Sequence, residues 1–167
     1  IDYILNTHHH FDHTGGNLDL QKKYDAEIIG SKKDEKRIPG INIKLSDNEI
    51  FKLGNIDFKI FLTSGHTSGH ICFYSKSEKI VFTGDTLFSL GCGKVFEGTH
   101  QEMLMSLNLI KKLPIDTQIY CGHEYTKKNL DFCLKYEINN NRLEEKKKWI
   151  TSRLSKKEPT IPITIEE

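Results

Sequence analysis

The segment from Thr7 to Gly16, THHHFDHTGG, constrains this chain most strongly, because it holds four histidines and an aspartate between His8 and His13. A hydrophobic core rarely tolerates so many imidazoles, and a solvated surface gives no reason to cluster them. Side chains two residues apart in an extended segment point the same way, so His8 and His10 can face one point. Asp12 follows at the same two-residue spacing and points the same way, whereas His13 faces a neighbouring point. We therefore expect this segment to supply ligands to two metal centres.

Three later segments can complete the ligand set, and each follows a predicted strand. They are TSGHTSGH with His66 and His70, VFTGDT with Asp85, and IYCGHEYT with His123. Ions such as zinc or iron accept mixed nitrogen and oxygen ligands. For His70 we favour a role in orienting a neighbour through a hydrogen bond over a role as ligand. We interpret His9 as structural, since it lies between His8 and His10 and should point the opposite way, away from the metals. We interpret His100 as part of a helix cap.

Alternating apolar residues predict most of the strands. The expected strands cover 2–7, 26–30, 49–53, 56–62, 70–75, 79–84 and 118–122. Those over 49–53 and 56–62 form a hairpin, as do those over 70–75 and 79–84. Residues 31–42 are polar and contain Pro39-Gly40, which indicates an exposed loop.

Four segments have helical patterns. A short helix is expected over 17–24, with Leu18 as its main apolar anchor. Thr99 and Glu102 match a capping box before a helix over 100–113, whose face carries Met103, Leu104, Leu107 and Ile110. Two more helices are expected over 127–137 and 142–154, the second capped by Asn141. Strands dominate the first part and helices the last, so we expect an α/β layered domain over 1–124 and a helical extension over 125–167.

Composition excludes several classes of function. The chain has 24 basic and 23 acidic residues, so no strong field draws nucleic acid or an anionic membrane. No apolar run approaches the ~18 residues that span a bilayer. The four cysteines are widely spaced, which favours free thiols in a reducing compartment. We expect a cytoplasmic protein, with an organellar form left open because the chain starts without methionine.

The motifs also resemble a known family. THHHFDH is similar to the T-H-x-H-x-D-H signature of the metallo-β-lactamase superfamily. The segments TSGHTSGHICFY, VFTGDTLFSLGCGKVFEGT, LPIDTQIYCGHEYT and EPTIPITIEE resemble, in order and spacing, glyoxalase II, the hydroxyacylglutathione hydrolase family. This resemblance implies a four-layered αββα sandwich followed by a helical domain. It also implies that two zinc ions, or iron or manganese, are bound by His8, His10 and His66, by Asp12, His13 and His123, and by Asp85 as the bridge.

The implied activity is hydrolysis of S-D-lactoylglutathione to D-lactate and glutathione by a monomer. Asp85 would hold the two metals as a catalytic residue, and our hypothesis is that Asp12 also orients the nucleophile. Lys94 and Tyr125 match glutathione contacts, whereas Phe96 stands where some members have tyrosine, so a hydroxyl contact is lost. The family continues beyond both ends of this sequence. We therefore expect a truncated chain with an incomplete glutathione site.

Two alternatives remain open from the sequence. Another enzyme of the same superfamily, such as a lactamase, a lactonase, a persulfide dioxygenase or a tRNA-processing nuclease, could carry THHHFDH. A fragment whose metals only support folding is the second alternative. Metal content, together with hydrolysis of lactoylglutathione against nitrocefin, separates these possibilities.

Overall fold

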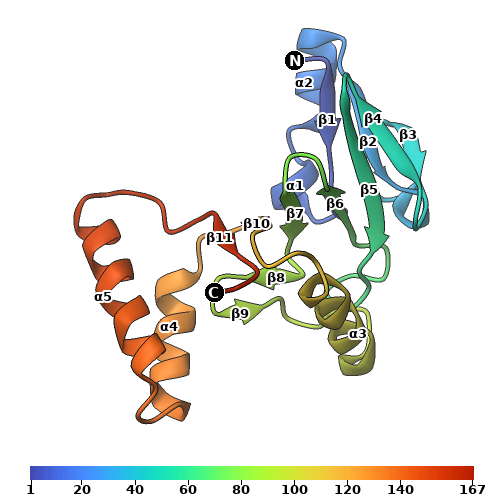
Figure 1. Ribbon diagram of the computed structural model, residues 1–167. Coiled ribbons are helices and arrows are strands. Elements are labelled where there is room, and N and C mark those ends of the chain that lie inside the picture. Colours follow the sequence, from blue (N-terminus) through green and yellow to red (C-terminus); the bar gives the residue numbers. More distant parts are fainter.

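Two β-sheets form the centre of the fold in a computed structural model that describes residues 1–167 (Figure 1). The first is a parallel sheet with the order β1 (Tyr3–Leu5), β2 (Glu27–Ser31), β3 (Ile41–Leu45). The second has the order β11-β10-β7-β6-β5-β4. Its strands are β4 (Ile50–Leu53), β5 (Ile56–Leu62), β6 (Ile71–Ser75), β7 (Ile80–Gly84), β10 (Gln118–Cys121) and β11 (Ile163–Thr164). A short hairpin, β8 (Leu87–Phe88) and β9 (Gly91–Cys92), follows β7.

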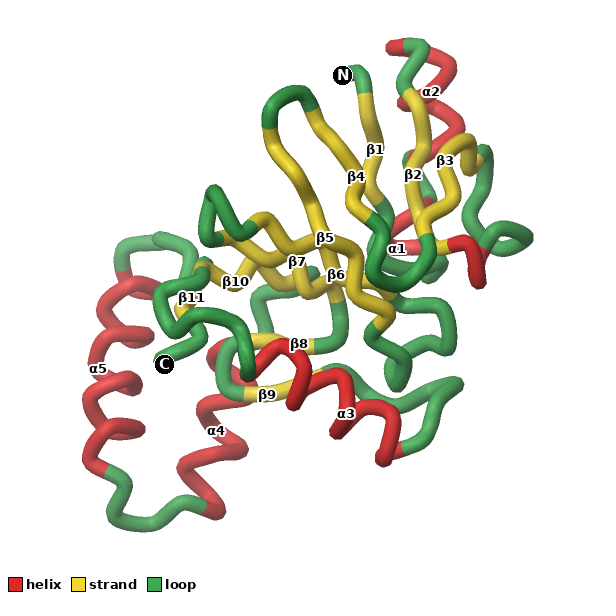
Figure 2. Tube along the Cα trace, turned by 45° about the vertical axis from the view of Figure 1, so that its right-hand side comes forward, coloured by secondary structure: helices red, strands yellow, loops and turns green.

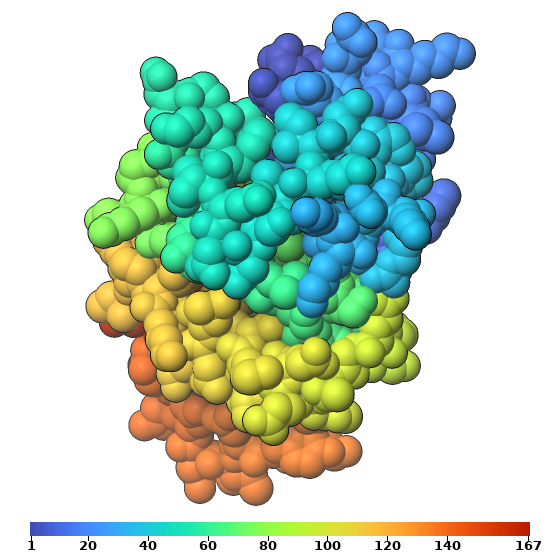
Figure 3. All heavy atoms as spheres, turned by 90° about the vertical axis from the view of Figure 1, so that its right-hand side faces the viewer, coloured from blue at the N-terminus to red at the C-terminus, as the bar shows by residue number.

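Helices cover the outer faces and form the C-terminal part. They are α1 (Phe11–Thr14), α2 (Asn17–Tyr24), the 3₁₀ turn η1 (Lys32–Asp34), α3 (His100–Lys111), α4 (Thr126–Tyr136) and α5 (Asn141–Ser155). Figures 1 and 2 show α2 beside the first sheet and α4 and α5 side by side at the other end of the molecule. Figure 3 shows residues of α3, in yellow, between the blue-green strand region and the orange helical region. None of the helices combines the length and the apolar composition that crossing a bilayer requires.

Both faces of the second sheet are buried, which produces the four layers. Along β6, Ile71 and Phe73 join a core that contains Ile29 of the first sheet. Cys72 and Tyr74 point to the opposite face and join a second core with Ile110 of α3. A strand buried on both faces has a continuous apolar sequence, as ICFY does. The expected αββα sandwich with a C-terminal helical part is confirmed.

The predicted hairpins are confirmed, since β4 pairs with β5 and β6 pairs with β7, each antiparallel. The capping box is also confirmed: the Thr99 side chain accepts a hydrogen bond from the Glu102 N–H, and the Glu102 carboxylate accepts one from the Thr99 N–H. Strands β7 and β10 are parallel, so their carboxyl ends meet at one edge of the sheet. Asp85 and His123, which follow these strands, are thereby brought to the same edge.

Residues 31–42 were expected to form an exposed loop, and this is wrong in part. The segment contains the turn η1 and the first residues of β3, and Asp34 is completely buried. Arg37 donates a hydrogen bond to Asp34, which offsets the cost of burying that carboxylate. A pattern of polar residues cannot reveal a buried ion pair, because its members look like surface residues.

Four expectations about helices also fail in detail. Leu18 is 55% exposed, whereas its neighbour Asn17 is buried and donates a hydrogen bond to Asn6 Oδ1 at 2.8 Å. Leu104 is 56% exposed, and α3 ends at Lys111. The cap of α5 is Asn140 and not Asn141, since the Asn140 side chain accepts from the Leu143 N–H. The two boundary shifts, of two residues at the end of α3 and of one at the start of α5, are typical of helix boundaries.

Candidate metal centre

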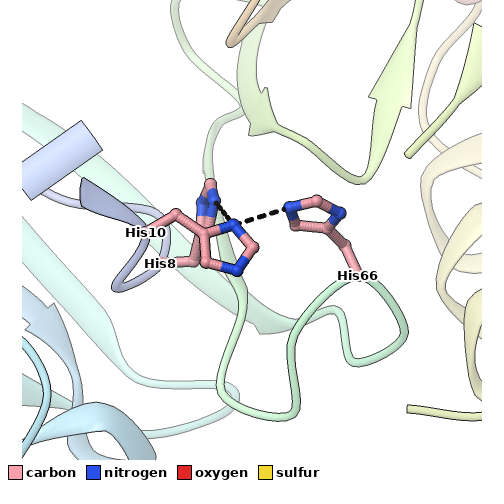
Figure 4. Close-up of side chains that lie close together, drawn as sticks. All are labelled: His8, His10 and His66. Atoms are coloured by element: carbon pink, nitrogen blue, oxygen red, sulfur yellow. Dashed lines mark hydrogen bonds between the residues drawn. The ribbon is translucent and has the colours of Figure 1, made fainter. Parts of the chain in front are cut away.

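Three histidines from two loops form the first group of candidate ligands. His10 Nδ1 lies 3.1 Å from His8 Nε2 and 3.1 Å from His66 Nε2. Figure 4 shows the three rings gathered around this point, His66 approaching from the loop between β5 and β6. The other ring nitrogen of His66, Nδ1, donates to the Lys94 carbonyl at 2.8 Å. A carbonyl only accepts, so His66 Nε2 presents its lone pair to the group, as a metal ligand must.

The second group lies beside the first and joins α1 to the end of β10. His123 Nε2 is 3.2 Å from His13 Nε2 and 3.2 Å from Asp12 Oδ2. Asp12 was expected to lie in an extended segment and to face the same way as His8 and His10. This is wrong, because residues 11–14 form α1. Asp12 and His13 are adjacent on this helical turn, and both reach His123. Helical geometry, rather than an extended strand, therefore aims them at the second group.

Asp85 lies between the two groups. Its Oδ1 is 3.3 Å from His13 Nε2, and its Oδ2 is 3.5 Å from His123 Nε2 and 3.6 Å from His66 Nε2. Oδ1 is buried and has no hydrogen-bond partner. An orphaned carboxylate oxygen surrounded by imidazole nitrogens is costly unless a cation completes the site. The donor atoms thus fit metal ions, and the candidate ligands fall into three sets with separations within 4.8 Å in each: His8, His10 and His66; His8, His13 and Asp85; Asp12, His13 and His123.

The ionisation states follow from the same contacts. Burial lowers the pKa of His8, and the neighbouring histidines lower it further, so its ring stays neutral. Burial alone would raise the pKa of Asp85, but the His13 ring at 3.3 Å and the charges of His123 and His66 hold it below its ordinary value. The neutral His8 ring and the ionised Asp85 carboxylate are forms that bind metals. Asp85 raises the pKa of His13, so His13 must lose a proton when it binds a metal.

Lys94, Phe96 and Tyr125 lie at the edge of these groups. The Phe96 ring is 5.6 Å from the His10 ring and 5.3 Å from the His66 ring, between centroids, and Lys94 Nζ lies 4.9 Å from the Phe96 centroid. Tyr125 stacks on His123 with centroids 4.9 Å apart. All three side chains are exposed, so a molecule that reaches the ligand groups can contact them.

The remaining histidines differ from the candidate ligands. His70 is completely buried, and its Nε2 accepts from the Asp85 backbone N–H at 3.1 Å. Its Nδ1 therefore carries the hydrogen and faces the hydroxyls of Thr63 and Thr86, at 2.9 and 3.1 Å. This agrees with the interpretation of His70 as a residue that orients a neighbour. His9 contacts Asp34, away from the ligand groups, and His100 is the first residue of α3.

Three polar residues around the site were not found from the sequence. Asp34 contacts His9, while Arg37 and Glu97 form an ion pair beside them. A weak signal was present, since Asp34 and Arg37 are three residues apart, as ion pairs within one turn often are. Nothing local in the sequence connects either residue to Glu97.

Acidification is expected to destabilise the metal-free protein through His70. Burial lowers the pKa of His70 to about 3, from an ordinary value of 6.5. Between these values the unfolded chain binds a proton that the folded protein does not, so the free energy of unfolding falls as the pH falls. The contribution of His70 to the free energy of unfolding is fully present only well above pH 6.5. Between pH 7.5 and 5, His70 should contribute a loss of about 2 kcal/mol.

Urea unfolding of metal-free wild type and His70→Gln at both pH values measures this contribution. The variant should lose less stability on acidification than the wild type. His100→Gln, which changes an exposed histidine, is the matched control and should behave like the wild type. Equal losses in the wild type and His70→Gln would contradict the assignment.

Comparison with known proteins places these features in a family context. Residues 1–123 match the family model of the metallo-beta-lactamase superfamily, and residues 124–167 match that of the hydroxyacylglutathione hydrolase C-terminus. The chain is 56% identical over its whole length to a hydroxyacylglutathione hydrolase from Pelagibacter ubique, of which it spans 70%. It is 44% identical over 99% of its length to one from Maricaulis maris, of which it spans 64%.

Solved structures share the fold. ETHE1 from Myxococcus xanthus has a TM-score of 0.67 and 28% identity, with 74% of this chain and 54% of that chain covered. The BLEG-1 B3 metallo-beta-lactamase has a TM-score of 0.67 and 27% identity, with 73% and 69% covered. TTHA1623 in a di-iron-bound form has a TM-score of 0.61 and 26% identity, with 71% and 68% covered. Fold and donor groups together support a binuclear metal site in this chain.

Proposed function

The chain belongs to the metallo-beta-lactamase superfamily and, within it, to the hydroxyacylglutathione hydrolase family, and from this premise we propose that it hydrolyses S-D-lactoylglutathione to D-lactate and glutathione. The observation that carries the proposal is the position of Asp85. Its carboxylate lies between two groups of donors, one oxygen facing His13 and the other facing His66 and His123. A two-metal site bordered by exposed residues suits hydrolysis of a carbonyl compound.

We propose that one metal ion is held by His8, His10 and His66, a second by Asp12, His13 and His123, and that Asp85 binds both. Zinc is the proposed ion, with iron or manganese as alternatives, because mixed imidazole and carboxylate donors suit these ions. When bound, the ions supply Lewis acidity, which lowers the pKa of water and polarises the thioester carbonyl.

The side chains of this chain orient the reacting groups. His70 fixes the backbone of Asp85 through the hydrogen bond to its N–H, and the Lys94 carbonyl fixes the ring of His66. The Asp12 side chain is 59% exposed, so its free oxygen can accept a hydrogen bond from water and orient it. The leaving thiolate belongs to a thiol with a pKa near ~8.5, so it departs without a dedicated general acid.

Three exposed residues are proposed to hold the tripeptide. The Lys94 ammonium attracts a carboxylate of glutathione, and the Tyr125 hydroxyl donates a hydrogen bond to its backbone. Phe96 supplies an apolar contact, since its ring is 58% exposed beside His10 and His66. The ordinary alternative for Lys94 is a solvated surface lysine. Kinetics of Lys94→Gln would distinguish the two. KM should rise in this variant if Lys94 contacts the substrate, and it should stay unchanged if Lys94 is only a solvated lysine.

Element-specific metal analysis, alongside an assay of lactoylglutathione hydrolysis, tests the proposed function. Two metal ions per chain, turnover of lactoylglutathione and no turnover of nitrocefin are expected. One iron per chain would favour the persulfide dioxygenase alternative. Two metals without turnover, in this chain and in one extended at its N-terminus, would favour a non-catalytic metal-binding domain.

Phe96→Tyr is expected to lower KM for lactoylglutathione roughly fivefold, because a hydroxyl at this exposed position can hydrogen-bond the tripeptide. Metal content and kcat should stay unchanged, since the ring approaches the histidines without binding a metal. Steady-state kinetics with metal analysis measure both. Phe132→Tyr, at a phenylalanine of α4 that is 64% exposed, is the control and should leave KM unchanged. A fall in metal content in Phe96→Tyr would contradict the assigned role.

We also propose a division of the chain into a metal-binding unit over 1–124 and a helical extension over 125–167. The separate core that Leu130, Leu143 and Ile150 form between α4 and α5 supports this division. The extension is not wholly helical, because β11 returns to pair with β10 in the second sheet. A monomer is proposed, which light scattering can test. The four free cysteines are consistent with a reducing compartment such as the cytoplasm.

A further inference from the structure

A charge network joins four segments around the candidate metal centre, and the mechanism above makes no use of it. Its centre is the guanidinium of Arg37. Arg37 Nη2 donates to Asp34 Oδ1 and Nη1 donates to Glu97 Oε1, each at 2.5 Å. The Asp34 side chain is 0% exposed and that of Glu97 is 28% exposed. The Arg37 guanidinium lies between these two carboxylates, so its positive charge offsets their mutual repulsion.

Glu97 extends the network to the loop that carries His66. Its second oxygen, Oε2, accepts from the Ser68 backbone N–H at 2.9 Å and from the Ser68 hydroxyl at 3.0 Å. Burial would raise the pKa of Glu97, but the hydrogen bonds from Arg37 and Ser68 lower it to about 2. The Glu97 carboxylate thus stays ionised across the physiological pH range and keeps its hydrogen bonds to Arg37 and Ser68.

The segment that contains Glu97 also carries Lys94 and Phe96, two of the three proposed glutathione contacts. Its backbone is fixed to the same loop at two points: the Phe96 N–H donates to the His66 carbonyl at 3.2 Å, and the Gly98 N–H donates to the Gly65 carbonyl at 3.1 Å. The Glu97 side chain lies between these two bonds in the sequence. Releasing it would leave residues 94–98 held to this loop by those two backbone bonds and by the bond from His66 Nδ1 to the Lys94 carbonyl.

Asp34 extends the network in the other direction, to the histidine loop. Its second oxygen, Oδ2, lies 3.1 Å from His9 Nδ1, and His9 Nε2 lies 3.4 Å from Glu97 Oε1. His9 is the residue between the two candidate ligands His8 and His10. The network therefore connects the candidate ligands to the segment of residues 94–98 through contacts that involve no ligand atom.

We propose that Arg37 is a positioning residue that sets substrate affinity: by bridging Asp34 and Glu97, it holds Lys94 and Phe96 in place beside the histidine loops. The proposal rests on the function proposed above, because it assigns Lys94 and Phe96 to the substrate. Arginine is required because its planar guanidinium donates to two carboxylates at once from fixed directions, which a lysine ammonium does not reproduce.

Arg37→Gln tests the proposal through both kinetics and local protection. The variant should raise KM for lactoylglutathione roughly tenfold, while kcat and metal content stay near the wild-type values. Hydrogen exchange of the Phe96 and Gly98 amides should accelerate, while the amides of α3 keep their protection. Adding Glu97→Gln to this variant should change KM by less than about twofold, because both substitutions break the same bridge.

Two further variants control for charge and for folding. Arg37→Lys keeps the charge but not the double contact, so it should raise KM and amide exchange in the same direction, to a smaller extent. If Arg37→Gln does not fold, Arg37→Lys tests the proposal in its place. Lys79→Gln removes an exposed ion pair with Asp116, before β7 and at the opposite end of that strand from Asp85, and should leave KM and exchange unchanged.

Unchanged KM and unchanged exchange at Phe96 and Gly98, in both Arg37 variants, would overturn the proposal. A fall in metal content and kcat with unchanged KM would also overturn it, because Arg37 would then act through His9 on the ligands. A wild-type chain that does not hydrolyse lactoylglutathione would instead refute the proposed function. In that case the exchange comparison alone decides whether Arg37 positions residues 94–98.

Discussion

Replacing Asp85 with alanine is expected to abolish hydrolysis of lactoylglutathione, with a loss of at least about a thousandfold in kcat/KM. The physical reason is that Asp85 supplies the negative charge between His13, His66 and His123, at distances of 3.3 to 3.6 Å. Without it, Asp12 is the only carboxylate left beside these imidazoles, and it lies in the second group alone, so no anion is shared between the two groups. Metal content should fall below two ions per chain, which element-specific analysis of the purified variant measures.

Asp116→Ala is the matched control for this prediction. Asp116 is an aspartate paired with Lys79 on the surface, with a side chain that is 52% exposed, and an ion pair so exposed contributes little to stability. Its removal should leave both metal content and turnover unchanged. An Asp85→Ala protein that retains two metals and near-normal turnover would show that the carboxylate does not bridge the groups, and the proposed ligand set would be wrong.

Replacing Gly93 with alanine is the second large effect expected. A methyl group at residue 93 would lie 1.8 Å from the Asp85 carbonyl oxygen and 3.1 Å from His66 Nδ1. The nearest atom belongs to the backbone and cannot rotate away, so the turn after β7 must move. The free energy of unfolding should fall by about 3 kcal/mol, as in other overpacked sites, and activity should fall with the displaced Asp85 by roughly a hundredfold.

Urea unfolding, metal analysis and kinetics of the Gly93→Ala protein check these expectations together. Gly16→Ala is the control, because a methyl group there has its nearest neighbour, Leu20 Cδ1, at 3.6 Å, an ordinary contact distance. Residue 16 has φ of −89°, so alanine is not strained there. Wild-type stability and metal content in Gly93→Ala would mean that Asp85 does not depend on this close approach.

Much of the fold followed from local patterns. The hairpin of β4 and β5 was predictable because apolar residues alternate along 56–62, and the start of α3 because Thr99 and Glu102 satisfy its first N–H groups. These signals are local, since period and capping depend on residues a few positions apart. The exposure of Leu18 and the burial of Asp34 were missed, because they depend on which surfaces other segments cover.

The candidate site divides in the same way. Histidines at 8, 10 and 13 indicated a metal centre because the chain places them within six residues. Asp12, however, was assigned to an extended segment, and the structure has it on the helical turn α1. Arg37 could not be related to Glu97, 60 residues later, from any local pattern.

What the sequence determined by itself is the chemistry of the donors and the approximate positions of most strands and helices, because both depend on residue type and short spacing. What only the tertiary structure decided is which donors meet. His13 and His123 are 110 residues apart, and their ring nitrogens lie 3.2 Å from one another. Such a contact depends on strand order, since the parallel alignment of β7 with β10 places Asp85 and His123 at one edge of the sheet. The physical reason is that convergence of distant loops is a property of the packed layers, which no segment specifies alone.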